Sequence, residues 1–148
     1  MHVRRGDVID PASCDANSTY YQERRCRNGL HRFTPDEVYF DLIARLRKKL
    51  VGASFQVFAI GAAAEFESWR DKGVELVLNG DILEDWKSMA QADVFVTAAS
   101  SFSFLPALLN TRCVIFQPLC LPALRGWIDT NLTGFDRCLA RVVNSKGP

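Results

Sequence analysis

The sequence predicts an α/β protein built on a Rossmann-like, doubly wound parallel sheet of about five strands, with all 148 residues in one domain. Short strand-like runs alternate with segments of helical periodicity, a pattern typical of parallel strands covered by helices on both faces. The chain is long enough, and at 48% hydrophobic residues apolar enough, to bury the core that such a sheet requires.

Five short runs are the candidate strands. The first reads as the end of a strand, and others are bounded by turn signals such as Gly61 and Asn79-Gly80. The predicted strands span residues 1–5, 55–60, 74–78, 93–97 and 114–116. A polar stretch over residues 10–33 follows the first of them, and a loop of that length is usually functional or disordered.

The segment after this loop carries the clearest helix signals. Thr34 is the predicted N-cap and Pro35 the first helical residue. The apolar residues that follow recur every four positions, at Val38, Leu42, Leu46 and Leu50. Further helices are predicted over residues 65–72, 82–90, 100–109, 121–127 and 134–143.

The overall charge and hydropathy argue against several classes of partner. A formal net charge of +1 gives no broad basic surface for nucleic acid or for an anionic membrane. No apolar run reaches the roughly 18 residues that a membrane-spanning helix needs. Neither nucleic acid nor a membrane span is therefore expected, and any anion must bind at a local cluster of residues.

The five cysteines include no CxxC pair and are odd in number, so neither a zinc site nor a fully paired set of disulfides is indicated. Cys14 and Cys26 could be bridged in an oxidising compartment; the alternative is that both are free thiols. The sequons Asn17-Ser18-Thr19 and Asn131-Leu132-Thr133 fit passage through the secretory pathway, although such triplets also arise by chance.

The first cluster of candidate site residues is His2-Val3-Arg4-Arg5-Gly6-Asp7, at the end of the first predicted strand. Neighbouring side chains on a strand point to opposite faces, so one arginine is expected to turn inward or to lie at the strand's end. A guanidinium there would bind a diphosphate through two parallel hydrogen bonds. The alternative is a solvated basic turn in which His2 is a structural histidine.

The second cluster, Ala98-Ala99-Ser100-Ser101-Phe102-Ser103, lies between a predicted buried strand and a helix. Small residues let the backbone approach a ligand closely, and hydroxyl groups at a helix start add to the hydrogen bonds of its unpaired N–H groups. The alternative is an ordinary serine N-cap. Both clusters follow the carboxyl ends of predicted strands, where parallel sheets bind their ligands.

Together the two clusters resemble a known family. His2-Val3-Arg4-Arg5-Gly6-Asp7 is similar to the H-x-R-R-x-D signature of the α1,2- and α1,6-fucosyltransferases and their protein O-fucosyltransferase relatives. Asp85, followed by Gln91-Ala92-Asp93-Val94-Phe95-Val96 and then Ser100-Ser101-Phe102-Ser103, resembles the second conserved block of that family. The resemblance covers residues 1–117.

The resemblance implies a GT-B-like enzyme whose C-terminal, Rossmann-like half binds GDP-fucose and whose transfer inverts the anomeric carbon without a metal. By motif position, Arg4 would clamp the pyrophosphate and stabilise the leaving group, and Ser101 would contact the β-phosphate. Asp85 and His2 would recognise guanine, since the two oxygens of one carboxylate can accept from N1–H and the exocyclic amine together. The alternative for Asp85 is a solvated helix carboxylate.

The other motif residues are expected to support the same donor site. Arg5 and Asp7 would brace the loop through charge-assisted hydrogen bonds, and Ser100, Phe102 and Ser103 would help to bind the donor. No D-x-D pair is present in the sequence, so fixed arginine and helix N–H donors must stabilise the charge that develops on GDP.

Two parts of such an enzyme are not found in the sequence. In the α1,6 branch the catalytic base is a glutamate after the motif histidine, at a position held here by Ala12, with Asp10 and Asp15 nearby; no base is assigned. The acceptor-binding half that precedes the motif is also missing, so the chain is expected to be a fragment. The acceptor would be a glycan or glycoprotein, and the resemblance implies the Golgi or secretory pathway.

Two other classes of function remain open. The first is a nucleotide-binding remnant or module without turnover. The second is an unrelated doubly wound binding domain whose motif match is accidental, and the sequence argues against it because neither a G-x-G-x-x-G nor a G-x-x-x-x-G-K-[ST] loop is present.

Overall fold

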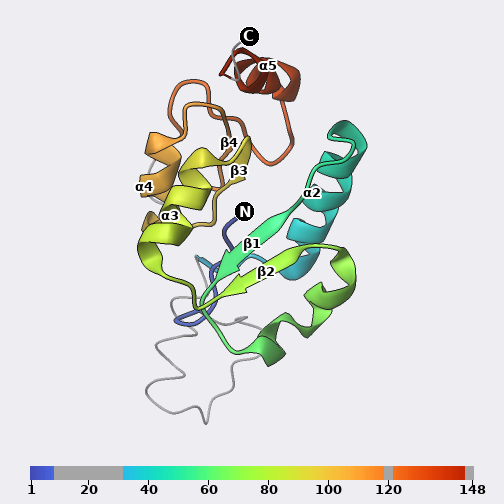
Figure 1. Cartoon of the computed structure of the whole chain (residues 1–148), viewed down its shortest axis with the longest axis vertical. Helices are drawn as coiled ribbons and strands as arrows, with labels where there is room; N and C mark the ends of the chain where they lie inside the picture. The colour runs from blue at the N-terminus through green and yellow to red at the C-terminus, as the bar shows by residue number, and fades with distance from the viewer. Residues whose placement is uncertain (9–31, 119–121, 146–148) are drawn as a thin grey trace. The chain divides into compact units, whose positions relative to one another are not determined.

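The computed structural model of the chain describes residues 1–8, 32–118 and 122–145. These residues belong to two compact units: unit 1 comprises residues 1–2 and 81–148, and unit 2 comprises residues 3–80. The four strands of the described residues pair in parallel, two in each unit (Figure 1). The α/β class and its parallel strand pairing are therefore confirmed, while the single five-stranded sheet stays a prediction.

Unit 2 alternates helices with its two strands. Helix α2 (Asp36–Lys49) is followed by β1 (Gln56–Ala59), the 3-10 helix η2 (Ala63–Lys72) and β2 (Glu75–Leu78). β1 and β2 are in register from Gln56 opposite Glu75 to Ala59 opposite Leu78. The N–H of Val3 donates to the carbonyl of Phe58 (2.9 Å), so the N-terminal segment of the unit lies along β1.

The core of unit 2 is aromatic. Trp69 of η2 is fully buried, and its ring lies 5.8 Å from Tyr39 and 4.8 Å from Phe40, both on α2. Leu42 and Leu46 of α2 are buried as the four-residue spacing predicts. Packing of this kind, rather than helix propensity, gives a helix most of its stability in a folded protein.

Unit 1 holds the remaining elements in the order α3 (Ile82–Gln91), β3 (Val94–Val96), α4 (Ser101–Leu109), β4 (Cys113–Ile115) and α5 (Phe135–Ser145). β3 and β4 are parallel, with Phe95 opposite Val114. Two further segments lie along this pair: the N–H of His2 donates to the carbonyl of Val96 (2.9 Å), and Ile128 forms a parallel bridge with Ile115.

A disulfide between Cys113 and Cys138 joins the first residue of β4 to α5. Both cysteines are buried, and their Cα atoms are 5.0 Å apart. The sequence had indicated no such pair. The bridge predicted as one option for Cys14 and Cys26 lies outside the described residues.

The structure corrects three local predictions. Pro35, not Thr34, is the N-cap of α2, and it has no side chain that could cap the helix. Residues 1–5 form strand-type hydrogen bonds but no strand. The helix predicted over residues 121–127 is wrong for the described residues 122–127, because Gly126 has a φ of +91° and the chain then pairs with β4 at Ile128.

Among the described residues, no helix is long and apolar enough to cross a membrane.

Candidate functional site

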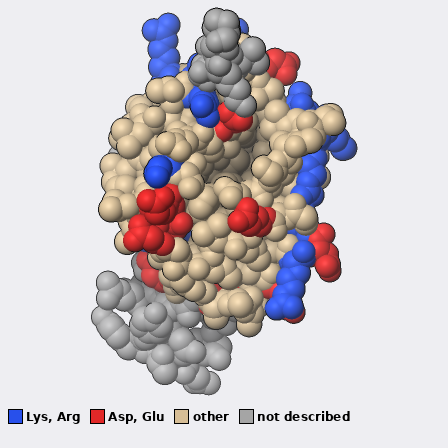
Figure 2. All heavy atoms as spheres, viewed as in Figure 1, with Lys and Arg blue, Asp and Glu red and all other residues tan. Residues whose placement is uncertain are grey.

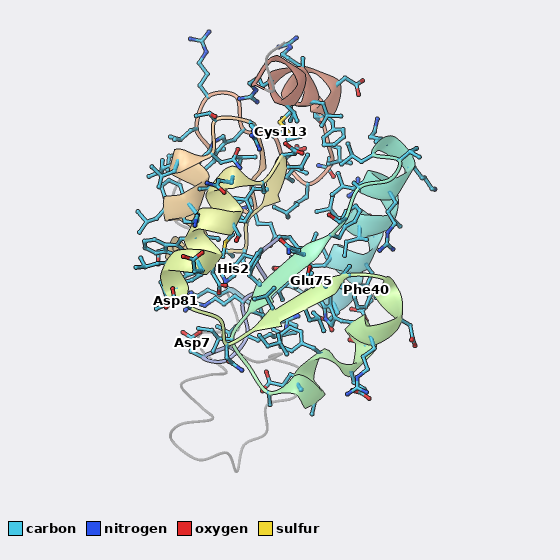
Figure 3. All side chains as sticks on the ribbon, in the orientation of Figure 1. His2, Asp7, Phe40, Glu75, Asp81 and Cys113 are labelled. Carbon is cyan, nitrogen blue, oxygen red and sulfur yellow. A yellow bond between two sulfur atoms is a disulfide. The ribbon has the colours of Figure 1, made fainter. Side chains whose placement is uncertain are left out.

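The carboxyl ends of β3 and β4 define one edge of unit 1, and parallel sheets bind ligands at this edge. α4 begins there, because only the loop of residues 97–100 separates it from β3. α3 ends two residues before β3, so its first turn is directed to the same edge. In Figure 3, His2 and Asp81 lie toward this end of the unit and Cys113 toward the other.

The start of α4 is held by hydrogen bonds from its serines. Ser100 is the N-cap, with an extended backbone, and its hydroxyl accepts the N–H of Phe102 (3.2 Å). The fully buried Ser103 hydroxyl accepts the N–H of Ala98 (3.1 Å) and has the carbonyl of Ala98 within 3.2 Å. These bonds fix the loop, so the serine N-cap reading is correct for Ser100 and Ser103 is structural.

Ser101 has a different environment from its two neighbours. It is the first residue of α4, and its side chain is exposed. The first N–H groups of a helix have no partner within the helix and commonly bind phosphate. Ser101 is therefore the exposed serine of this motif, at the start of a helix.

The first turn of α3 is acidic. Asp81 is its N-cap and accepts the N–H groups of Leu83 (2.9 Å) and Glu84 (3.1 Å). Figure 2 shows acidic side chains gathered over α3. The first turn of α4 carries no acidic residue. Carboxylates offset the positive end of a helix dipole, so an anion is attracted to the start of α4 rather than to that of α3.

Asp85, in this first turn of α3, is only 9% exposed, so it is not the solvated carboxylate of the alternative interpretation. Burial raises the pKa of the Asp85 carboxyl above its ordinary value, and the Asp81 carboxylate raises the pKa further. A carboxyl group with a raised pKa near a sheet edge is a common feature of functional sites, although structural carboxyls show it too.

Three aromatic rings from α3, α4 and the N-terminal segment contact one another. Phe102 of α4 is 5.1 Å from the ring of His2 and 5.6 Å from that of Trp86, which follows Asp85 on α3. The structure thus brings the predicted residues His2 and Phe102 into direct contact. Trp86 had been missed, because a half-buried tryptophan on an amphipathic helix reads as core in a single sequence.

Arg4 and Asp7 of the first motif belong to unit 2 and bind each other. Nη2 of Arg4 is 2.5 Å from Oδ2 of Asp7. The Arg4 side chain is 16% exposed and that of Asp7 54% exposed. Gly6 between them has a φ of +76°, and a Cβ atom there would approach the carbonyl oxygen of Ile60 to 3.2 Å, so the tight turn requires glycine.

Arg5 is the arginine that turns inward, as the strand argument predicted for one of the pair. Its buried guanidinium donates to Asp36 at the start of α2, to the carbonyl of Thr34 (3.0 Å) and to that of Arg4 (2.8 Å). It also lies 4.4 Å over the ring of Phe33. The solvated basic turn is therefore wrong for Arg5, whose donors are directed to the protein.

Asp36 completes this network and was not among the predicted site residues. Its Oδ1 accepts from Arg5 and its Oδ2 from the hydroxyl of Ser68 (2.8 Å). A contact across 31 positions leaves no signal in a single sequence.

The structure therefore divides the predicted site residues between its two units. His2, Asp85 and the serine segment belong to unit 1, whereas Arg4, Arg5 and Asp7 belong to unit 2. Ala12, Asp10 and Asp15, considered for the catalytic base, lie outside the described residues, as does the sequon at Asn17. Among the described residues, no group of three or more His, Cys, Asp or Glu side chains could hold a metal ion.

No protein-family model, curated protein sequence or solved structure matches the chain.

Proposed function

We propose that the chain is a glycosyltransferase-type domain that binds GDP-fucose for metal-independent, inverting transfer of fucose to a glycan or protein acceptor. In this proposal its strands belong to a Rossmann-like sheet of about five strands, like the C-terminal half of a GT-B enzyme. The acceptor hydroxyl gives its proton to a base, for which no residue is assigned, and its oxygen attacks the anomeric carbon of fucose. The bond from that carbon to the diphosphate oxygen breaks, and GDP leaves with the bonding electrons.

The observation that carries the proposal is the contrast between the two helix starts at the carboxyl edge of unit 1. The start of α4 offers Ser101 and helix N–H groups with no acidic residue in its own first turn, which suits a phosphate. The start of α3 offers the buried carboxyl of Asp85, which suits the N–H donors of guanine once it is ionised. Phe102, which is half-buried and contacts the buried ring of His2, contributes a ring on which a base can stack.

Arg4 is the residue of the first motif that we propose to bind the pyrophosphate. It is the less buried arginine of the motif, and it forms an ion pair with the exposed Asp7, which a diphosphate could replace. Arg5 does not fit this role, because its guanidinium is committed to Asp36 and two carbonyl groups. In the transition state, Arg4 would stabilise the charge that develops on GDP.

Isothermal titration calorimetry without added metal tests the proposal. GDP is expected to bind more tightly than UDP or ADP, because only guanine presents two donors to Asp85, and Arg4→Ala is expected to abolish binding. Arg112→Ala is the matched control: Arg112 also pairs with an aspartate, Asp93, but lies at the amino ends of β3 and β4. Equal affinity for the three nucleotides would remove the guanine assignment.

A second measurement separates an enzyme from a nucleotide-binding module. Incubation with GDP-fucose and a panel of glycans, followed by detection of released GDP, reports hydrolysis or transfer. Tight GDP binding with no release of GDP from the sugar nucleotide would identify a binding module without turnover.

A further inference from the structure

A cavity of about 470 Å³ lies in unit 1 directly after the carboxyl end of β4. Phe116, Trp127 and two prolines supply its apolar walls, and Asp129 and Thr133 supply polar groups. The rings of Phe116 and Trp127 have centroids 5.2 Å apart. A volume of about 300–1,000 Å³, mostly apolar walls and a few polar groups are typical of a small-molecule site.

The walls of this cavity are fixed by backbone pairing. The N–H of Phe116 donates to the carbonyl of Ile128 (2.8 Å), and the N–H of Ile128 donates to that of Val114 (3.0 Å). The two aromatic residues thus stand on paired, neighbouring segments. Binding to walls that are already ordered loses little conformational entropy.

Helix α5 adds further support to the same walls. The Cys113–Cys138 disulfide attaches α5 to β4, and Arg141 of α5 donates to the carbonyl of Gly126, next to Trp127. This support leaves the position of the Trp127 backbone independent of any ligand.

The polar groups of the cavity limit the class of ligand. Oδ1 of Asp129 accepts the N–H groups of Asn131 (3.1 Å) and Thr133 (3.4 Å) and so closes the turn between them. Among the described residues, Oδ2 has only the Asn131 amide, at 3.5 Å, and it is able to accept a further hydrogen bond from a ligand. Because no cation is among the described lining residues, this carboxylate disfavours phosphate and other anions.

We propose that this cavity binds a neutral pyranose. One C–H face of the sugar ring stacks on the indole of Trp127, and a ring hydroxyl donates to Oδ2 of Asp129. A pyranose matches the site because it combines an apolar face with hydroxyl donors at its rim and carries no charge. The identification of this pyranose as part of the acceptor glycan rests on the proposed function. The binding of a saccharide to the cavity does not depend on it.

Titration of the isotope-labelled full chain with methyl β-galactoside and methyl β-glucoside, followed by NMR, tests the assignment. The chain is made in bacteria, so that its sequons stay unmodified. Saturable shifts of the Trp127 indole N–H are expected at millimolar sugar. Asp129→Asn keeps Oδ1 and the turn but replaces the free acceptor, and a lost bond to a charged group should weaken binding by about tenfold.

Trp86→Phe is the matched control, because Trp86 lies in the same unit but does not line the cavity; sugar affinity is expected to be unchanged. The inference is overturned if no pyranoside gives saturable shifts, if Asp129→Asn binds as well as the parent chain, or if tetramethylammonium binds more tightly than either sugar. Sugar binding without GDP binding would leave the cavity assignment standing and reject the proposed function, and the reverse result would reject the cavity assignment alone.

Discussion

Asp85 is buried in the first turn of α3, and both its burial and the Asp81 carboxylate raise its pKa. The folded chain therefore binds this proton more tightly than the unfolded chain does. The protonated Asp85 carboxyl contributes its full share to the stability of the fold below the ordinary pKa of 3.8. This contribution is lost as the pH rises through the raised pKa. An ionised Asp85 thus destabilises the fold at neutral pH.

Asp85→Asn is expected to raise the free energy of unfolding at neutral pH, because the amide carries no charge to desolvate. The gain should vanish below pH 3.8, where the native carboxyl is protonated. Urea denaturation at both pH values measures this difference. The same variant should lose affinity for GDP; an unchanged affinity would mean that Asp85 does not contact guanine.

Replacing the neighbouring residues Arg5 and Arg4 by alanine is expected to change the stability of the chain by different amounts. Arg5→Ala leaves Asp36 without its cation and should cost about 3 kcal/mol, as the loss of one partner of a buried ion pair does. Arg4→Ala breaks a pair with an exposed partner and should cost less than about 1 kcal/mol.

Thermal and urea unfolding of the two arginine variants, compared with their GDP titrations, tests this division. Arg5→Ala should lose stability, whereas Arg4→Ala should remain folded and lose nucleotide binding. Similar stability losses for both variants would contradict the distinct environments of the two side chains.

At the level of the secondary-structure elements, the start of α4 permits a paired test of capping and binding. Ser100→Ala removes the acceptor for the Phe102 N–H and should destabilise the chain by about 1 kcal/mol, whereas Ser100→Asn should restore the cap. Ser101→Ala alters an exposed side chain and should change stability by less than about 0.5 kcal/mol.

GDP titration of these α4 variants completes the test. Ser101→Ala should weaken GDP binding if its hydroxyl reaches the β-phosphate. Suppose that Ser101→Ala binds GDP as tightly as the parent chain and that Ser100→Ala loses stability as expected. The serine motif would then have only a capping role.

The elements that could be predicted from the sequence are those set by local patterns. The four-residue spacing of apolar side chains located α2, and short apolar runs located all four strands to within two residues at either end. Strand geometry also predicted that one of the two arginines would turn inward or lie at the strand's end, without indicating that it is Arg5 that turns inward. These features depend on neighbours in the chain, which a single sequence displays.

The features that were missed depend on contacts between distant residues. Ile128 pairs with Ile115 in place of the helix expected before it, because the backbone bond to β4 outweighs the local preference of residues 122–127. The Cys113–Cys138 bridge spans 25 positions, and spacing alone cannot choose it among five cysteines. Asp36 was missed for the same reason, because its contact with Arg5 spans 31 positions.

At the level of the whole molecule, the two units should respond differently to reduction. The Cys113–Cys138 disulfide closes a loop of 25 residues in unit 1, and its loss should destabilise that unit by about 3 kcal/mol. Unit 2 has no disulfide among its described residues. Reduction is therefore expected to shift the unfolding of unit 1 more than that of unit 2.

The three tryptophans allow this to be measured by fluorescence. Trp69 reports on unit 2, whereas Trp86 and Trp127 report on unit 1. Variants that retain Trp69 alone or Trp127 alone can be unfolded in urea with and without reductant. Equal shifts of both transitions would show that the units unfold as one cooperative body.

The Asx turn beside the cavity also carries the second glycosylation sequon, Asn131-Leu132-Thr133. Asn131 is exposed, and its amide nitrogen, the atom to which an N-glycan is attached, lies 3.5 Å from Oδ2 of Asp129. In a eukaryotic host that modifies Asn131, a covalently tethered sugar would stand at the cavity's rim at a high effective concentration. Material from such a host and from bacteria would then differ in how readily the cavity accepts a free saccharide, and Asn131→Gln would make the two preparations equivalent.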